Sequence, residues 1–318
     1  MLTYGNLSIS LIRSGKGDCI HLRFMGSSGY PHNVIIDTGS TSTAGEFRKL
    51  YNDVIFAGEV IDTLFISHYD DDHIGGILKL VESGIFPQIK SVYFNAYSGG
   101  IEPVAELTAM QGQRLFHSNL YDVVNSSVTK GDVICLDGAV ISVIGPSQDS
   151  LTQAMSQMKK ADASFIPLAA ISDWKRSFDE LRKEEYPAPD ISISNKSSIV
   201  FILTYEERNF LFCGDAPASE IAEGLRDIDM HKFDLVKLPH HGSCRNISKE
   251  LLELIEADSF MICADGKSHP DKHAIAKLLD FYGTVLIYSN YSWWMNGFLQ
   301  HEDIKYIENR KLVFKCII

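Results

Sequence analysis

The sequence predicts an α/β fold in which two β-sheets pack together and helices cover their outer faces. Short apolar runs that are typical of strands occur near both ends of the 318-residue chain. Several of these runs are followed by segments with apolar residues at helical spacing. Such a mixture favours two packed sheets with helices outside. No repeat, linker or low-complexity tract divides the chain, so we expect residues 1–318 to form a single domain.

The first predicted elements lie before residue 85 and alternate between strands, turns and one helix. Helical spacing of apolar residues predicts a helix over 73–84, with Gly84 as its C-terminal stop. The run that precedes it is short, apolar and bounded by polar residues, as expected for a buried strand. The predicted strands here are "LSISLIRS" (7–14), "CIHLRF" (19–24), "NVIIDTGS" (33–40) and "DTLFISH" (62–68).

The remaining elements repeat this pattern around one exception. Residues 147–190 contain no strand pattern and at least two helical stretches, so we expect a helical insertion there, with 173–185 as an amphipathic helix. A lid carrying Lys175, Arg176 and Arg182 is the alternative for that stretch. Helices are also predicted over 247–258 and 271–283. The other predicted strands are 91–97, 132–137, 139–146, the two strands of the hairpin 197–215, 233–239, 258–264 and 284–289.

Composition and charge restrict the partners that the protein can have. The chain is 45% hydrophobic and 22% charged, which is ordinary for a globular protein. Its net charge is −12, whereas proteins that grip a long nucleic-acid backbone are usually basic. We therefore expect a nucleotide or a short nucleic acid, rather than a long duplex, if the ligand is a polyanion.

The cysteines and the apolar runs indicate a cytoplasmic protein. The six cysteines are scattered, and none forms a C-x-x-C pair. Residues 1–18 lack a basic start, a long apolar stretch and a cleavage site, so no signal peptide is predicted. No apolar run approaches the roughly 18 residues of a membrane span. A reducing cytoplasm and no membrane association are the expectations.

The stretch "HYDDDH" (68–73) places three carboxylates and two imidazoles within six positions. In an extended segment, His68, Asp70 and Asp72 would share a face, and His73 would follow at the start of the predicted helix. Carboxylates this close repel one another and raise each other's pKa. A bound cation would relieve that repulsion, so the stretch predicts a metal site rather than an acidic turn.

This stretch resembles the second motif of the metallo-β-lactamase superfamily, usually His-x-His-x-Asp-His. The version with an aspartate at the second histidine resembles the hydrolase domain of ComEC-type DNA-uptake proteins and its free-standing relatives. Other stretches match that subgroup in order, and the match spans nearly the whole chain apart from 147–190. They are "SGKGDC" (14–19), "IIDTGS" (35–40), "NKSSIVFIL" (195–203), "LFCGD" (211–215), "VKLPHHGS" (236–243) and "GKSHP" (266–270). The resemblance implies a four-layer αββα metallo-β-lactamase sandwich.

The resemblance also implies roles for individual residues in a centre with two divalent metal ions. It implies that a water between the metals is the nucleophile, which is coherent with the clamp that two metals form on attacking and leaving oxygens. His269 is predicted to protonate a leaving alkoxide or to hold a phosphate oxygen. The implied ligands are His68 and Asp70 for the first metal, Asp72, His73 and His240 for the second, and Asp215 as the bridge. Asp72 is also assigned to catalysis.

Several positions remain open within this scheme. Asp37 is expected to orient a ligand histidine or to support its loop, and Asp18 either does the same or only shapes a turn. His241 is the weaker alternative to His240, which we expect at the end of its strand. The superfamily's third-motif histidine has no counterpart near "NKSS", and Asn195 is a candidate for that place. His117 is the only histidine between His73 and His231, and it is expected on the surface.

Three functions remain in competition. The first is a phosphodiesterase or nuclease with manganese favoured over zinc, because Asp70 and Asn195 make the first site rich in oxygen. The second is hydrolysis of a lactone or another carboxyl ester, which favours two zinc ions and a full histidine set. The third is a degenerate binding module. The retained metal-site residues argue against it; they are Asp72, His73, Asp215 and His240. The sequence leaves open whether a protein partner delivers the substrate.

Overall fold

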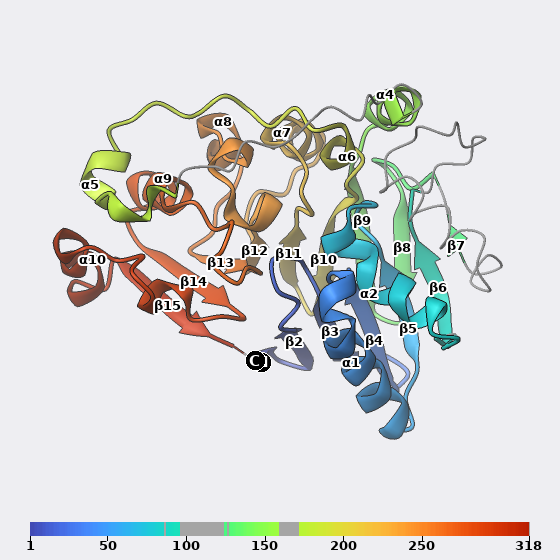
Figure 1. Ribbon diagram of the computed structural model, residues 1–318. Coiled ribbons are helices and arrows are strands. Elements are labelled where there is room, and N and C mark those ends of the chain that lie inside the picture. The colour runs from blue at the N-terminus through green and yellow to red at the C-terminus, as the bar shows by residue number, and fades with distance from the viewer. Residues whose placement is uncertain (86, 96–123, 126, 159–171, 318) are drawn as a thin grey trace.

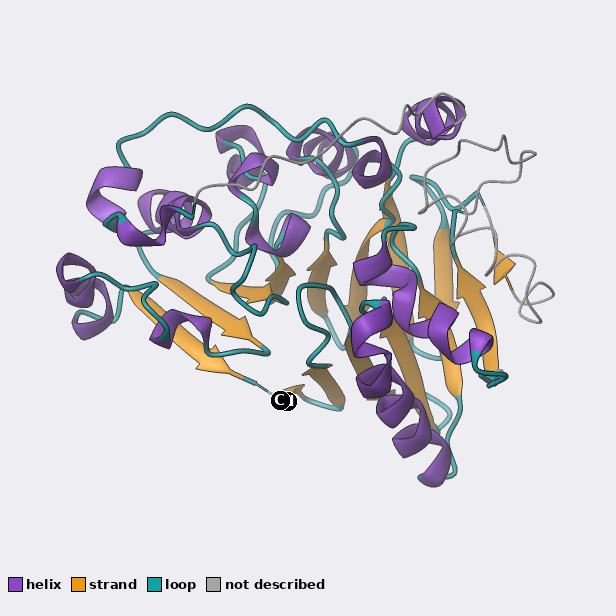
Figure 2. Cartoon of the chain, viewed as in Figure 1, coloured by secondary structure: helices purple, strands orange, loops and turns teal. Residues whose placement is uncertain are grey.

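The computed structural model describes residues 1–85, 87–95, 124–125, 127–158 and 172–317. Two β-sheets pack face to face, and helices cover the outer face of each (Figure 1). Figure 2 makes the layers visible by separating helices from strands. The architecture is the expected four-layer αββα sandwich. His117, expected on the surface, lies outside the described residues.

The first sheet holds seven strands of the described chain in sequential order. Its first four strands pair antiparallel, and from the fourth strand onward the pairing is parallel. The strands are β1 (Leu2–Tyr4), β2 (Leu7–Leu11), β3 (Ile20–Met25), β4 (Pro31–Ile36), β5 (Ile61–Phe65), β6 (Ile89–Tyr93) and β7 (Val124–Asn125).

The second sheet holds eight described strands and changes direction in the same way. Strands β8 to β11 pair antiparallel, and β11 to β15 pair in parallel. They are β8 (Val133–Leu136), β9 (Ala139–Gly145), β10 (Val200–Tyr205), β11 (Arg208–Phe212), β12 (Leu235–Lys237), β13 (Ser259–Ile262), β14 (Val285–Ser289) and β15 (Leu312–Cys316). The segments that follow β4, β5, β11 and β12 therefore lie at the carboxyl ends of parallel strands. This is the edge of the sheet at which α/β proteins place their ligands.

Helices flank both sheets, and three apolar clusters hold the four layers together. One cluster joins the facing sides of the sheets, for example Phe65 with Phe201, whose ring centroids lie 4.6 Å apart. A second joins the first sheet to α1 and α2, and a third joins the second sheet to α7, α8 and α9. The helices are α1 (Ala44–Phe56), α2 (Asp71–Glu82), α4 (Gln148–Met158), α5 (Phe178–Leu181), α6 (Ile193–Lys196), α7 (Ala218–Arg226), α8 (Lys249–Glu253), α9 (Lys272–Tyr282) and α10 (Ile304–Glu308).

The structure corrects the prediction of one amphipathic helix over 173–185. A 3₁₀ turn at Asp173–Lys175 is followed by the one-turn helix α5. Ser177 caps α5 in a capping box with Glu180, so a new helix starts inside the stretch. The Asp173 carboxylate accepts hydrogen bonds from the backbone N–H groups of Lys272 and His273 on α9, which ties the turn to α9 and prevents a continuous helix.

The described part of 147–190 forms no strand, as expected. That residues 1–318 form one domain with this segment inserted stays a prediction. Among the described helices, none has the length and apolar character needed to cross a bilayer.

Candidate metal centre

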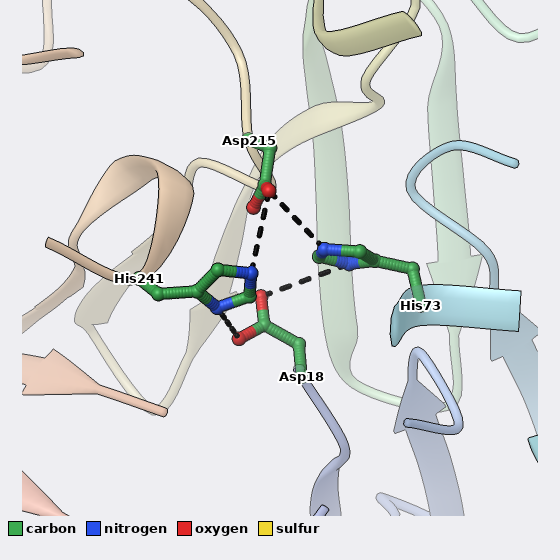
Figure 3. A group of neighbouring side chains, drawn as sticks. All are labelled: Asp18, His73, Asp215 and His241. Carbon is green, nitrogen blue, oxygen red and sulfur yellow. Dashed lines mark hydrogen bonds and ion pairs between the residues drawn. The ribbon is translucent and has the colours of Figure 1, made fainter. Parts of the chain in front are cut away.

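Four buried side chains from distant parts of the chain meet at the strand ends. Asp18, His73, Asp215 and His241 each offer one ligand atom, and these atoms lie within 4.8 Å of one another. Asp18 precedes β3, His73 lies in the first turn of α2, Asp215 follows β11, and His241 follows β12. Figure 3 shows Asp215 and Asp18 on opposite sides of the two imidazoles.

Asp37 ties the ends of β4 and β5 to the start of α2. Its carboxylate accepts hydrogen bonds from the backbone N–H of Ser67 at 2.7 Å and from the Ser67 hydroxyl at 2.8 Å. It also accepts one from Nδ1 of His73 at 2.8 Å. With Nδ1 of His73 donating to Asp37, its Nε2 faces Oδ2 of Asp215, 3.2 Å away, and is the nitrogen that a metal ion would bind.

Two glycines allow the close approach on which this geometry depends. A Cβ on Gly76 would lie 2.1 Å from the carbonyl oxygen of Thr38, so only glycine lets α2 lie against the loop after β4. A Cβ on Gly17 would lie 1.8 Å from the carbonyl oxygen of Asp72. The turn before β3 therefore packs directly on the start of α2, which brings Asp18 beside His73.

His68 and His241 are oriented in the same way as His73. Nδ1 of His68 lies 3.1 Å from the hydroxyl of Ser67, which already donates its proton to Asp37 and so accepts from the imidazole. Nδ1 of His241 donates to Oδ1 of Asp18 at 3.1 Å. The Nε2 atom of His241 then lies 3.3 Å from Oδ2 of Asp215 and 3.8 Å from Oδ2 of Asp72.

These residues fit a metal ion, because several of their buried ligand atoms have no hydrogen-bond partner. The Nε2 atoms of His68, His73 and His241 and Oδ1 of Asp215 are buried without one. A buried polar atom without a partner is costly, and native proteins contain few of them. Histidine nitrogens and carboxylate oxygens are also ordinary ligands of divalent metals. The described residues thus form a candidate metal centre.

Electrostatics in the cluster favour carboxylates that are ionised. Burial acts to raise the pKa of the Asp215 carboxyl, but His241 and His73 outweigh it and hold that pKa well below its usual range. Burial acts to lower the pKa of His241, but Asp215 and Asp18 raise it to about 9. For Asp72, the imidazoles of His73 and His241 overcome burial and bring the pKa to about 2. The site therefore presents anionic oxygen ligands at neutral pH.

Comparison with known proteins agrees with the fold. Residues 32–267 match the family model of the metallo-β-lactamase superfamily. The chain belongs to this superfamily. Members of the superfamily are metal-dependent hydrolases. No curated protein matches the chain.

Several solved metallo-β-lactamase-fold structures are similar at low identity. The protein YhfI from Bacillus subtilis is 11% identical with a TM-score of 0.44, over 97% of this chain and 96% of that one. A metallo-β-lactamase from Cronobacter sakazakii is 12% identical with a TM-score of 0.36, over 74% and 78%. One from Pontibacter korlensis is 12% identical with a TM-score of 0.34, over 71% and 82%. Similarity at this level carries no information about the substrate.

Within the superfamily pattern, the second motif differs in one respect from its expected conformation. Helix α2 begins at Asp71, so Asp72 lies in the first helical turn and not on an extended face with His68 and Asp70. Asp70 precedes the helix in an extended conformation, and its Oδ2 lies 3.5 Å from Nε2 of His68. The helical turn moves Asp72 toward His241 and away from that pair. As ligands, these residues stay predictions.

The structure also places the two adjacent histidines differently from the sequence preference. Strand β12 ends at Lys237, and His240 and His241 follow in a 3₁₀ turn with positive φ angles of 46° and 53°. His241 lies in the cluster with His73 and Asp215, whereas Nε2 of His240 is 3.8 Å from Oδ2 of Asp215. The geometry thus favours His241 over His240 as the partner of His73.

Asn195 and His269 lie at the edge of the centre. Asn195 is in α6, not in a strand, and its Nδ2 donates to Asp190 at 2.6 Å. His269 lies in the loop before α9, with its ring centroid 5.1 Å from that of His240 and 6.4 Å from that of His241. Its side chain is 22% exposed, so a substrate could reach it.

Sequence reasoning missed three residues that support the centre. Lys237 contacts Asp18 through Nζ, and its amine also donates to the carbonyl of Gly214 at 3.0 Å. A lysine inside the apolar run "FDLVKLP" was the available signal, because an interior strand rarely carries an unpaired charge. Asp190 and Asn246 surround His240, but Asp190 comes from an irregular segment and Asn246 from a short 3₁₀ turn, and no sequence pattern marks either residue.

Proposed function

We propose that the protein is a metal-dependent hydrolase that cleaves phosphodiester bonds in a nucleotide or a short nucleic acid, with manganese favoured and zinc possible. The main support is the pairing of Asp70 with His68, whose Oδ2 and Nε2 atoms lie 3.5 Å apart. A carboxylate at this position makes the ligand set richer in oxygen than a histidine would. Oxygen ligands suit manganese and magnesium, whereas nitrogen and sulfur ligands suit zinc.

The cluster offers ligands for two neighbouring metal positions. The first would be held by His68 and Asp70, the second by Asp72, His73 and His241, and Asp215 would serve both. Bound divalent ions supply an activated water near neutral pH and positive charge for developing oxygens. Asp37 and Asp18 orient ligand histidines, because each accepts a hydrogen bond from Nδ1 of one of them.

Other side chains of this chain suit an anionic substrate. Lys16 lies at the rim, 57% exposed, with Nζ 3.4 Å from Oδ2 of Asp72. Its ammonium can meet a phosphate oxygen while it remains near the centre. His269 lies near His240 with a partly exposed imidazole, where it would protonate the leaving alkoxide. A protein of net charge −12 is better suited to a short substrate than to a long duplex.

The resemblance of the ordered motifs to ComEC-type hydrolase domains adds support for a phosphodiester. Superfamily membership supports hydrolysis but does not distinguish the bond, so ester and lactone hydrolysis are outcomes of the test. The cytoplasm is the compartment that we propose, and the six cysteines, all free, are consistent with it.

The proposal is tested by removing metal with a chelator and restoring Mn²⁺, Mg²⁺, Zn²⁺ or Ni²⁺ separately. The substrates are bis-p-nitrophenyl phosphate, short single-stranded DNA and RNA, cyclic nucleotides, a lactone and a β-lactam. We expect the greatest activity with Mn²⁺ on a phosphodiester, and none in Asp215→Ala. Zinc-dependent activity confined to the lactone or the β-lactam would refute both the metal and the substrate class.

A further inference from the structure

We infer that His240 takes the place of the missing third-motif histidine and completes the first metal position, while His241 serves the second. This inference rests on the proposed function in requiring two metal positions, but it does not depend on the substrate. It also explains why two consecutive histidines face the same centre. Among the described residues, His240 is the histidine that lies near the carboxylate of Asp215, which would serve both metals, without belonging to the second position.

The tautomer of His240 is set by Asn246. The side-chain Nδ2 of Asn246 donates to the backbone carbonyls of Asp215 and Ala216 at 3.1 and 3.2 Å, and to the carboxylate of Asp190 at 3.1 Å. These three acceptors fix the orientation of the amide, so Oδ1 of Asn246 faces Nδ1 of His240 at 3.2 Å. An amide oxygen only accepts, and the imidazole therefore carries its proton on Nδ1.

The lone pair of His240 is consequently on Nε2, the atom that faces the centre. Oδ2 of Asp190 lies 3.4 Å from Nδ1 and fills the other side of the ring. Nε2 is 3.8 Å from Oδ2 of Asp215. A ligand histidine usually has this arrangement, in which an outer carboxylate or amide holds one nitrogen and leaves the other for the metal. His73 and His241 have the same arrangement with Asp37 and Asp18.

The backbone of the turn lets two neighbouring residues reach separate positions around one carboxylate. His240 and His241 are both left-handed, and the backbone N–H of His240 donates to the carbonyl of Gly214, next to Asp215, at 3.1 Å. Their rings diverge, with centroids 5.8 Å apart and planes at 72°. Both Nε2 atoms nevertheless face the same oxygen of Asp215, at 3.8 and 3.3 Å. A carboxylate that serves two metals would have one imidazole on each side.

The groups of the first position are also linked to His240 through α6. The hydroxyl of Ser194 donates to Oδ2 of Asp70 at 3.2 Å. The next residue, Asn195, has its Nδ2 3.3 Å from Nδ1 of His240. Asp70 and His240 thus both lie next to α6, at the adjacent residues Ser194 and Asn195, and His68 lies beside Asp70. Asn195, the sequence candidate for the third-motif place, lies behind His240 and donates through Nδ2 to Asp190, whose Oδ2 flanks Nδ1 of the imidazole.

The test uses purified full-length protein equilibrated with buffered Mn²⁺. Elemental analysis counts the bound metal, and electron paramagnetic resonance detects the signal of two magnetically coupled Mn²⁺ ions. We expect two equivalents and a coupled signal in the wild type. His240→Ala should fall to about one equivalent with an uncoupled signal, and Asp190→Asn should weaken the first equivalent by roughly 10–100-fold. His269→Ala is the matched control, a partly exposed neighbouring histidine that should keep both equivalents.

Two equivalents and a coupled signal in His240→Ala would overturn the inference and assign His240 to the substrate. A single equivalent in the wild type would overturn it as well. If His240→Ala does not fold, His240→Gln replaces it, because glutamine retains a polar side chain without an imidazole. Loss of one equivalent together with no phosphodiester cleavage by the wild type would support the inference while refuting the proposed substrate, so the two failures are distinguishable.

Discussion

Nζ of Lys237 contacts the carboxylate of Asp18, and both side chains are only 1% exposed. The same amine lies 3.7 Å from Oδ1 of Asp215. Burial acts to lower the pKa of Lys237, but the two carboxylates hold it above its usual value. The buried ammonium group of Lys237 therefore lies next to the carboxylates of the centre. Asp18 connects this group to His241.

We expect Lys237→Met to destabilise the protein by about 3–5 kcal/mol, because it leaves Asp18 buried without its cation. Urea unfolding of the metal-free protein measures the effect. Asp18→Asn added to Lys237→Met should recover part of the loss, since the unpaired charge is then removed. A loss below about 1 kcal/mol in the single variant would contradict the view that the pair is required in the folded core.

Asp37→Asn should weaken metal binding by roughly 10–100-fold, because the amide no longer fixes Nδ1 of His73 as the donor. Titration with a metal-sensitive dye measures the affinity. Asp62→Asn is a suitable control, because Asp62 is also a buried carboxylate of the first sheet. It binds Asn33 and Lys90 and not the residues of the cluster. Equal metal affinities in Asp37→Asn and Asp62→Asn would contradict the role of Asp37 in orienting His73.

Metal removal should lower thermal stability. Without a cation, the carboxylates of Asp72 and Asp215 face each other across unpartnered imidazole nitrogens. Metal at about 100 times its dissociation constant would restore about 2.7 kcal/mol, or roughly 4 °C in melting temperature for a chain of 318 residues. Calorimetry with chelator and then with excess Mn²⁺ measures this shift. In Asp215→Ala the shift should be much smaller, and an identical shift would place the stabilising metal elsewhere.

His269→Ala should reduce turnover about 100-fold, as expected when a general acid is lost, with metal content unchanged. The sharper readout is how the loss of turnover depends on the leaving group of the substrate. Aryl phosphodiesters, whose leaving group needs no protonation, should be affected far less than nucleotide substrates. His231→Ala, in the loop before β12 and hydrogen-bonded to Leu254, serves as the control. An equal loss on both substrate types would assign His269 to binding instead.

Local patterns were sufficient to predict most of the strands, α2 and the hairpin β10–β11. They depend on alternation, apolar spacing and turn residues within short windows. The same reasoning placed Asp18 in a turn before β3, as observed. By contrast, the stretch 173–185 has an amphipathic pattern, and only its contacts with α9 decide its conformation. Such contacts between distant segments leave no local mark.

The candidate site shows the same limit. The residues His73 and Asp215 could be selected from their motifs alone. The choice between His240 and His241 depends on two consecutive positive φ angles, which ordinary residues rarely adopt and which no spacing rule predicts. Asp190 reaches His240 across 50 positions of sequence from an irregular segment. Lys237 could be seen as unusual in its strand, but its partner, 219 positions away, could not.

The hydrogen bond between Asp18 and His241 joins residues that are 223 positions apart. A ribosome adds about 5–20 residues per second, so roughly 11 to 45 seconds separate the synthesis of these two residues. For most of that time the nascent chain already carries Asp37 and His73 but still lacks Asp215 and His241. Metal acquisition at the complete centre therefore follows the synthesis of His241, and the cell must keep metal available to a chain that already carries residues from both sheets.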